Sequence, residues 1–198
     1  INSENGKTTL GTLNVDGTFD VVTKDLEITT GMNVGGKVTI TSTGNVVVTP
    51  DATLSDLEIT SAKDVTFGKL KVSNLASITN EGKLTLGTGD FAGVTINSGS
   101  AEITSLKSTG EANLTTTGAL TLGTGEFADI TINSGSAGIT KITATGTSNL
   151  TTTGALTLGT GDFVGVTMTS NNGSVEITNL TSSNNVVINS ENGKTALG

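Results

Sequence analysis

The chain has 198 residues and a formal net charge of −8, and it contains no Cys, Trp, Tyr or His. All ten basic residues are Lys and the acidic residues are spread singly, which disfavours nucleic acids and anionic membranes as partners because both require basic patches. No His serves as a general base and no Cys as a nucleophile, so we do not expect an enzyme.

The two ends of the chain carry the same sequence. Ile1–Gly11 returns as Ile188–Gly198, with ten of eleven positions identical. We therefore expect residues 1–198 to form one continuous repeat segment, in which a second 187-residue repeat begins at residue 188. Such a segment is expected to belong to a longer array.

Short runs in which apolar and polar residues alternate predict strands in the N-terminal third. Pro50, the only proline, falls between two of these runs, where its missing N–H is harmless. The predicted strands are Asp20–Val22, Leu26–Ile28, Lys37–Ile40, Val46–Val48, Leu57–Ile59 and Val65–Phe67.

A shorter, 36-residue repeat follows. Asn113–Gly125 recurs unchanged at Asn149–Gly161, and Leu84–Gly89 carries its second half one period earlier. Strand-like pieces are separated by Asn-Ser-Gly-Ser and Ser-Thr-Gly, which predict turns. An insertion in the last unit is expected to form a loop at Ser170–Gly173. The predicted 36-residue units are 83–118, 119–154 and 155–192.

Many short strands fit either a sandwich or a solenoid, but a sandwich gives no reason for an exact sequence period. A solenoid stacks each unit on a nearly identical neighbour, so a period is expected. Half of the period is one coil, with room for three short strands. The sequence thus predicts an all-β parallel β-helix (β-solenoid) of about 18–19 residues per coil, ten coils rising about 48 Å, and almost no helix.

Phrases such as Ala112–Leu122 and Val94–Ser100 resemble the repeat regions of filamentous haemagglutinin-type exoproteins, the large adhesins that Gram-negative bacteria export by two-partner secretion. The resemblance covers nearly the whole chain, but the N-terminal secretion domain of that family is not part of it. It implies a right-handed parallel β-helix that forms a shaft on the bacterial surface.

Three acidic residues share one position in successive units, namely Asp90, Glu126 and Asp162. Paired carboxylates cleave glycosides in some enzymes, but these acids follow Gly-Thr-Gly, which predicts exposed turns. Their expected separation of about 9.6 Å is too long for one calcium ion to bridge. We interpret them as solvated acids and expect no catalytic, cofactor-binding or metal-binding residues.

Two other residue types repeat with the same period. Phe91, Phe127 and Phe163 are expected to form a column of core rings rather than an exposed aromatic ladder for glycans. Thr115–Thr117 and Thr151–Thr153 are equivalent, and Thr85, Thr121 and Thr157 form another series.

Flat ranks of Thr occur on ice-binding solenoids. Here Thr is expected to be scattered over several sides and interrupted by Lys, so ordinary β-propensity and hydroxyl ladders explain it. The interrupting residues are Lys37, Lys83, Lys107 and Lys141.

Glycosylation acceptor patterns begin at Asn113 and Asn149, and further ones at Asn172 and Asn179. In a chain so rich in Asn, Ser and Thr such matches also arise by chance. Asn113 and Asn149 remain candidate glycosylation sites, because some adhesins of the resembled class carry glycans on such residues.

The sequence therefore favours a structural shaft segment of a long bacterial surface adhesin or extracellular filament. Its expected partners are neighbouring copies of the same repeat stacked end to end and a host or environmental surface, with no insertion into a membrane. The alternatives are a stand-alone ice- or glycan-binding β-solenoid and, less favoured, a polysaccharide-cleaving β-helix that would use Asp90, Glu126 or Asp162.

Overall fold

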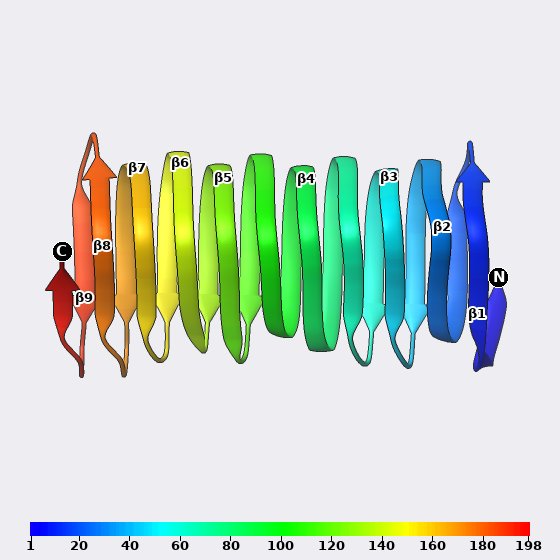
Figure 1. The fold of residues 1–198 in the computed structure, drawn as a ribbon, viewed down its shortest axis with the longest axis horizontal. Helices are drawn as coiled ribbons and strands as arrows, with labels where there is room; N and C mark the ends of the chain where they lie inside the picture. Colours follow the sequence, from blue (N-terminus) through cyan, green and yellow to red (C-terminus); the bar gives the residue numbers. More distant parts are fainter.

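The computed structural model describes all residues, 1–198, and has one parallel sheet wound into a solenoid (Figure 1). The predicted all-β parallel solenoid is confirmed, and the chain has no helix long and apolar enough to cross a membrane. The strands are β1 (Asn2–Val15), β2 (Phe19–Ser42), β3 (Val46–Ser61), β4 (Val65–Thr116), β5 (Ala119–Ser134), β6 (Ser136–Thr152), β7 (Leu156–Ser170), β8 (Val175–Ser182), β9 (Val186–Ser190) and β10 (Thr195–Leu197).

Each coil pairs in parallel with the coil before it. Val46 of β3, for example, pairs with Val65 of β4. Leu120 pairs with Ala137, and Ala137 pairs with Leu156, so two successive coils make up one period of the shorter repeat. The predicted coil length is confirmed, because the stacked coils take about 19 residues per turn.

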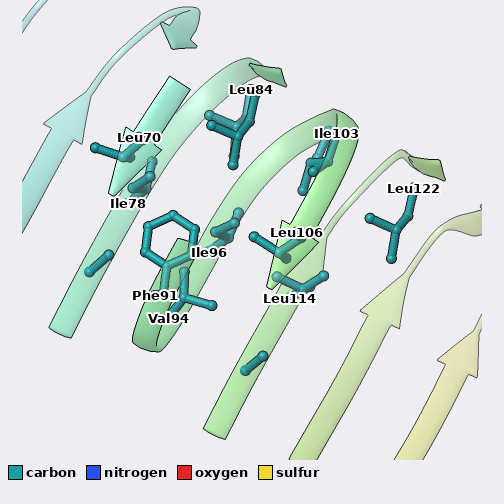
Figure 2. Close-up of a cluster of buried hydrophobic side chains, with 14 of the residues drawn as sticks. Leu70, Ile78, Leu84, Phe91, Val94, Ile96, Ile103, Leu106, Leu114 and Leu122 are labelled. Atoms are coloured by element: carbon teal, nitrogen blue, oxygen red, sulfur yellow. The ribbon is translucent and has the colours of Figure 1, made fainter. Parts of the chain in front are cut away.

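Most coils turn three short pairs of side chains, largely apolar, toward a common interior. In the coil that begins β3 these are Val46 and Val48, then Ala52 and Leu54, then Leu57 and Ile59, all of them buried. Their counterparts in the other coils join them in one core of 47 buried apolar residues that continues from coil to coil, part of which is drawn in Figure 2. The alternation of apolar and polar residues predicted this core, because successive side chains of a strand point to opposite faces.

Large and small side chains alternate from coil to coil on one inner face. Phe91, Phe127 and Phe163 are buried, as predicted. Phe127 pairs with Ser108 on one side and Ala144 on the other, so each ring lies between two small side chains. The residue two positions before each Phe is Gly, and the paired positions of the intervening coils hold Leu or Ile. The paired series are Leu106, Gly125, Ile142, Gly161 and Leu180, and Ser108, Phe127, Ala144, Phe163 and Ser182.

This alternation explains why the sequence repeats over two coils. A coil with Gly-x-Phe fills the space left by Leu-x-Ser or Ile-x-Ala in the neighbouring coils, and interiors tolerate few voids or overlaps. If two consecutive coils both carried Gly-x-Phe, their two rings would lie against each other. The sequence therefore returns to its starting pattern only after two coils.

The prediction of turns between the strands was only partly right, because breaks occur at 117–118, at Gly135 and at 153–155 but not at the other predicted turns. The segment 97–100 and the segment 108–110 lie inside the continuous strand β4, and Pro50 lies inside β3 next to a shift in the β3–β4 register. At a solenoid corner the strand bends but stays paired with the neighbouring coil. The backbones of the two coils must therefore approach closely, and the chain does not reverse its direction as it would in a hairpin turn. The loop predicted near Ser170 is confirmed, because β7 ends there and β8 begins at Val175.

Glycine serves these corners by lacking a side chain. No Gly in the chain has a positive φ, so conformational freedom is not what the corners require. A Cβ added to Gly123 would overlap the carbonyl oxygen of Thr104 in the preceding coil, and a Cβ on Gly99 would overlap that of Glu81. The glycines thus permit neighbouring backbones to approach closely.

A column of polar side chains occupies one inner corner of the solenoid. The hydroxyl of Ser61 donates to the carbonyl oxygen of Gly44 at 2.7 Å, and that of Ser42 donates to the carbonyl oxygen of Lys24 at 2.6 Å. The first and last members, Ser3 and Ser190, are equivalent positions of the repeated end sequence, so ten coils make up the long repeat. The members are Ser3, Thr23, Ser42, Ser61, Asn80, Ser98, Thr116, Ser134, Thr152, Ser170 and Ser190.

We predict opposite effects for two glycine substitutions in consecutive coils. Gly123→Ala should lower the free energy of unfolding by about 1–3 kcal/mol, because the new methyl meets the backbone of Thr104. Gly138→Ala should be neutral or stabilising by up to about 1 kcal/mol, because nothing lies within 4 Å of the added carbon. Urea denaturation measures both, and equal effects would contradict this account of the corners.

The polar column yields a second prediction. Ser61 accepts from the backbone N–H of Lys63 and donates to Gly44, so Ser61→Ala strands two buried groups and should cost about 1–3 kcal/mol. The buried hydroxyl of Ser134 has no partner, so Ser134→Ala should be nearly neutral. Thermal unfolding of the two variants tests this, and a larger loss for Ser134→Ala would refute it.

Candidate interaction surfaces

The three repeated acids point outward on one side of the solenoid. Glu126 pairs with Thr143, and Thr143 pairs with Asp162, so these two acids stand two coils apart as predicted. They lie within β5 and β7 and follow buried glycines, so the expected turns were wrong, but both side chains are exposed as expected. The carboxylate of Glu126 lies 3.9 Å from the Lys107 ammonium of the preceding coil. No three acidic side chains gather closely enough to hold a metal ion.

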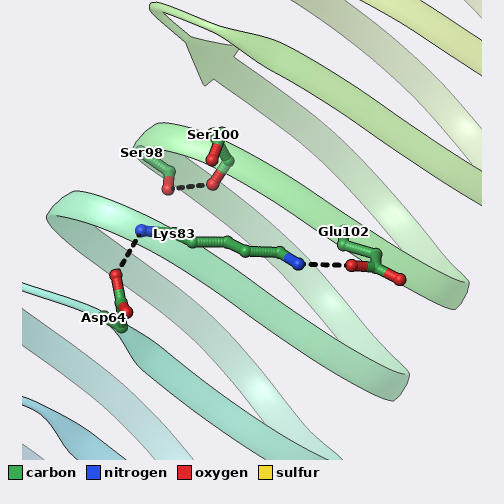
Figure 3. Close-up of polar contacts among 5 residues, drawn as sticks. All are labelled: Asp64, Lys83, Ser98, Ser100 and Glu102. Atoms are coloured by element: carbon green, nitrogen blue, oxygen red, sulfur yellow. Dashed lines mark hydrogen bonds and ion pairs between the residues drawn. The ribbon is translucent and has the colours of Figure 1, made fainter.

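Ion pairs link neighbouring coils along the outside. Lys37 lies 2.6 Å from Glu58, and Lys7 lies 2.6 Å from Glu27. Lys83 pairs with Glu102 of the next coil, while its backbone N–H donates to Asp64 of the previous coil at 2.7 Å (Figure 3). All these pairs are exposed, so each adds little to stability on its own. Each joins a side chain of one coil to a side chain of the next.

Two of these pairs shift ionisation. The hydrogen bond and charge of Lys83 hold the pKa of the Glu102 carboxyl below its ordinary value of 4.5. The hydrogen bond that Lys37 donates to Glu58, together with the charge of Glu58, raises the pKa of the Lys37 ammonium. A third shift lies at the same edge, where hydrogen bonds from the Asn74 side chain and the Leu75 N–H lower the pKa of Asp56, against a smaller opposing effect of burial.

The candidate glycosylation residues share one outward column. Asn113 pairs with Thr131, and Thr131 pairs with Asn149. Both side chains are reachable from solvent, and the Asn113 amide donates to the Glu111 carboxylate at 3.0 Å. Glycosylation at these positions stays a prediction.

The expectation that Thr is scattered was only partly right. Thr121 and Thr157 do lie on another side, where Gly138 separates them. Thr115 and Thr151, in contrast, belong to one outward column, with Asn133 between them and Thr169 next.

A parallel column two residues earlier in each coil completes a two-rank surface, which we call the Thr/Asn face. Its members, coil by coil, are Ser77 and Thr79, Thr95 and Asn97, Asn113 and Thr115, Thr131 and Asn133, Asn149 and Thr151, and Thr167 and Thr169.

The lysines expected to interrupt the Thr ranks do not interrupt this face. Lys107 pairs with Glu126 and Lys141 with Thr124, both on the side that carries the acids, and Lys83 lies next to Leu84 at the start of another side. Lys37 does lie on the side of the solenoid that carries the Thr/Asn face, but it stands two coils before Ser77, where the face begins. The sequence signal for this face was a polar–apolar–polar triplet that recurs once per coil. A count of Thr alone does not detect the triplet, because Asn takes the place of Thr in alternate coils.

The two ends of the solenoid are open (Figure 1). β1 pairs only with β2 at the N-terminal end, and β10 pairs only with β8 at the C-terminal end, so each leaves an unpaired strand edge. Apolar side chains of the core columns are uncovered there. Ile1 is 55% exposed and Leu197 is 63% exposed, whereas their counterparts within the stack are buried.

The repeated eleven residues form both ends of the solenoid, and the two copies are unpaired on opposite sides. Near the N-terminus, Ser3 pairs with Thr23 of the following coil. Near the C-terminus, the equivalent Ser190 pairs with Ser170 of the preceding coil. Together the two copies show the partners on both sides of one coil. The same segment is thus suited to lie between two coils.

Compared with known proteins, the chain matches no family model, no curated protein and no solved structure. Its function is therefore inferred from the geometry of the solenoid itself.

The shifted ionisations give a pH prediction. Because the pKa of Glu102 is lower in the folded chain than its ordinary value of 4.5, its contribution to stability is present above that pH. The contribution is lost as the pH falls through the folded value. Glu102→Gln should therefore reduce stability slightly at pH 7 and by less at pH 3, as measured by urea midpoints. A loss of equal size at both pH values would show that the ion pair is not its source.

Proposed function

We propose that this chain is a structural shaft segment of a long extracellular filament or bacterial surface adhesin. The observation that carries the proposal is the eleven-residue segment that occurs twice: one copy pairs with the coil after it and the other pairs with the coil before it, so the segment is suited to lie inside a continuous stack. A segment of this kind provides length and stiffness and holds other parts of a filament away from a surface. Its partners are further copies of the repeat, which cover the uncovered edges.

The coils suit a mechanical role. The chain forms 149 backbone–backbone hydrogen bonds, and strand β4 alone continues for 52 residues without a break. Bending the shaft or admitting a protease requires opening paired backbone, because few unpaired segments remain between strands. Short breaks such as 171–174 lie at the corners, where they leave the stacking intact.

The adhesin part of the proposal is supported by the resemblance to filamentous haemagglutinin-type repeats and by the acidic, cysteine-free composition. Export as an extended chain that winds into a solenoid outside the cell agrees with the short sequence distance between paired coils. Each coil pairs with the one formed about 19 residues earlier, so the solenoid grows by local steps.

End-to-end association provides the test. At high concentration the chain should form linear oligomers, because exposed strand edges and Leu197 are covered by the next copy. The double variant Val186→Lys with Leu197→Lys places charge on the C-terminal edge, because both residues pair with buried core residues of the preceding coil, and should keep the chain monomeric. Leu75→Lys is the matched control, since Leu75 is 55% exposed but lies on the side of the shaft.

Sedimentation velocity distinguishes the three chains. Oligomers of the parent chain and of Leu75→Lys, together with a monomeric end variant, would support the proposal. A parent chain that stays monomeric at millimolar concentration would contradict it, and so would an end variant that associates as strongly as the parent.

A further inference from the structure

The Thr/Asn face is uniform in chemistry. Seven Thr, four Asn and one Ser make up its twelve side chains, and none of them is charged. From Thr95 to Thr151 the two residue types alternate in both directions, Thr beside Asn within a coil and Thr above Asn between coils. Charged residues such as Glu111 and Glu81 stand outside the two ranks, at the corners. On a chain of net charge −8, six consecutive coils without charge in these ranks form a distinct surface.

The spacing of the face is fixed by the backbone. Successive coils are about 4.8 Å apart, and outward residues two positions apart in a strand are about 6.7 Å apart. The coils stack along one straight axis (Figure 1) and the columns follow it, so the ranks form a regular two-dimensional grid. Buried Ile96, Leu114, Ile132, Leu150 and Met168 lie between the two ranks and anchor the grid from below. The outward side chains are thus held in place before any ligand arrives.

Other occupants fit this face less well. The ranks cover on the order of 300 Å², from six coil spacings and a width of about 10 Å, well below the roughly 800 Å² per partner of a stable protein interface. All five Phe side chains are buried, so a sugar ring finds no aromatic platform. The neutral ranks also lack the cations that a phosphate or sulfate polymer requires.

We infer that the Thr/Asn face binds a crystalline water lattice, the surface of ice. Ice presents water oxygens in straight rows at separations similar to the grid, with no charge and no pockets. Hydroxyls and carboxamides supply donors and acceptors, and the Thr methyl groups lie between them. Because the grid is rigid, its side chains lose little conformational entropy when they bind ordered water, so the entropy cost of binding is small over the whole face.

A groove beside the ranks supports this inference. It has a volume of about 390 Å³, is lined by no hydrophobic residue, and runs along Thr79, Asn97 and Thr115 of three successive coils. The outer wall of the groove is formed by Glu81, Gly99 and Thr117. The groove therefore continues the regular polar surface beyond the two ranks, with Thr and Gly of successive coils along it.

The inference goes beyond the shaft function and does not depend on it. The face lies on the side of the solenoid, so it remains accessible when both ends are covered. A shaft with this face holds its bearer at an ice surface, and the ends still provide length.

Four substitutions test the assignment. Thr131→Lys with Thr167→Lys places two long charged chains in one rank of the face, one period apart. The matched control, Thr121→Lys with Thr157→Lys, makes the same change one period apart on a different side. Circular dichroism and thermal unfolding establish that both double variants keep the strand content of the parent chain.

Thermal hysteresis and the shape of single ice crystals are then measured for all three chains. The inference predicts faceted crystals and a hysteresis gap for the parent and the control, and round crystals with no gap for the face variant. A parent chain that leaves ice crystals round at millimolar concentration overturns the inference, as does equal activity or equal loss in both variants. Neither result affects the end-to-end association of the chain, which is measured separately.

Discussion

Parallel in-register stacking is the constraint on which the rest of the structure depends. Each residue lies directly over its counterpart in the preceding coil, so every inward column must pack against itself along the axis. The coils differ slightly in length, as the pairing of Leu120 with Ala137 and that of Leu26 with Val46 show. The register is corrected at the corners, where the ladder shifts between Val48 and Asp51 or between Phe127 and Ile130. Columns therefore stay aligned even though the coils are not identical in length.

Two inner columns show how this constraint shapes the sequence. The Phe column tolerates a ring only in every second coil, because Gly125 and Gly161 make room for Phe127 and Phe163 while Ile142 and Ala144 fill the coil between them. The polar corner column accepts Ser, Thr or Asn in every coil, because most of these short side chains reach a backbone carbonyl at the same corner. The exposed Thr/Asn alternation has the same two-coil period.

Much of this architecture was predictable from the sequence. The exact recurrence of Asn113–Gly125 as Asn149–Gly161 indicated the coil length, and alternation indicated the inward residues of each strand. The corners were not predictable, since Asn-Ser-Gly-Ser forms a turn in most contexts and only the pairing with the previous coil keeps segment 97–100 extended. The inward side chains of Ser98 and Thr116 were also missed, because polarity alone places such residues outside.

The surface was the harder part for the same reason. Acids at Glu126 and Asp162 were correctly spaced two coils apart, yet the lysines that pair with neighbouring coils lie on faces that only the register reveals. Counting residues along the sequence does not tell on which of the three sides of a coil a residue lies. That depends on where each corner falls, and only the pairing between coils shows this. Once the sides are known, one of them is a regular uncharged grid and the two ends are matched edges.

Electron cryomicroscopy of the concentrated chain tests the central claim most directly. If the open ends stack as in the shaft, the images will show filaments one solenoid wide, with a strand repeat of about 4.8 Å along the axis and a subunit rise of about 50 Å. Single particles of one subunit length, or bundles joined through their sides without end-to-end continuity, would contradict it.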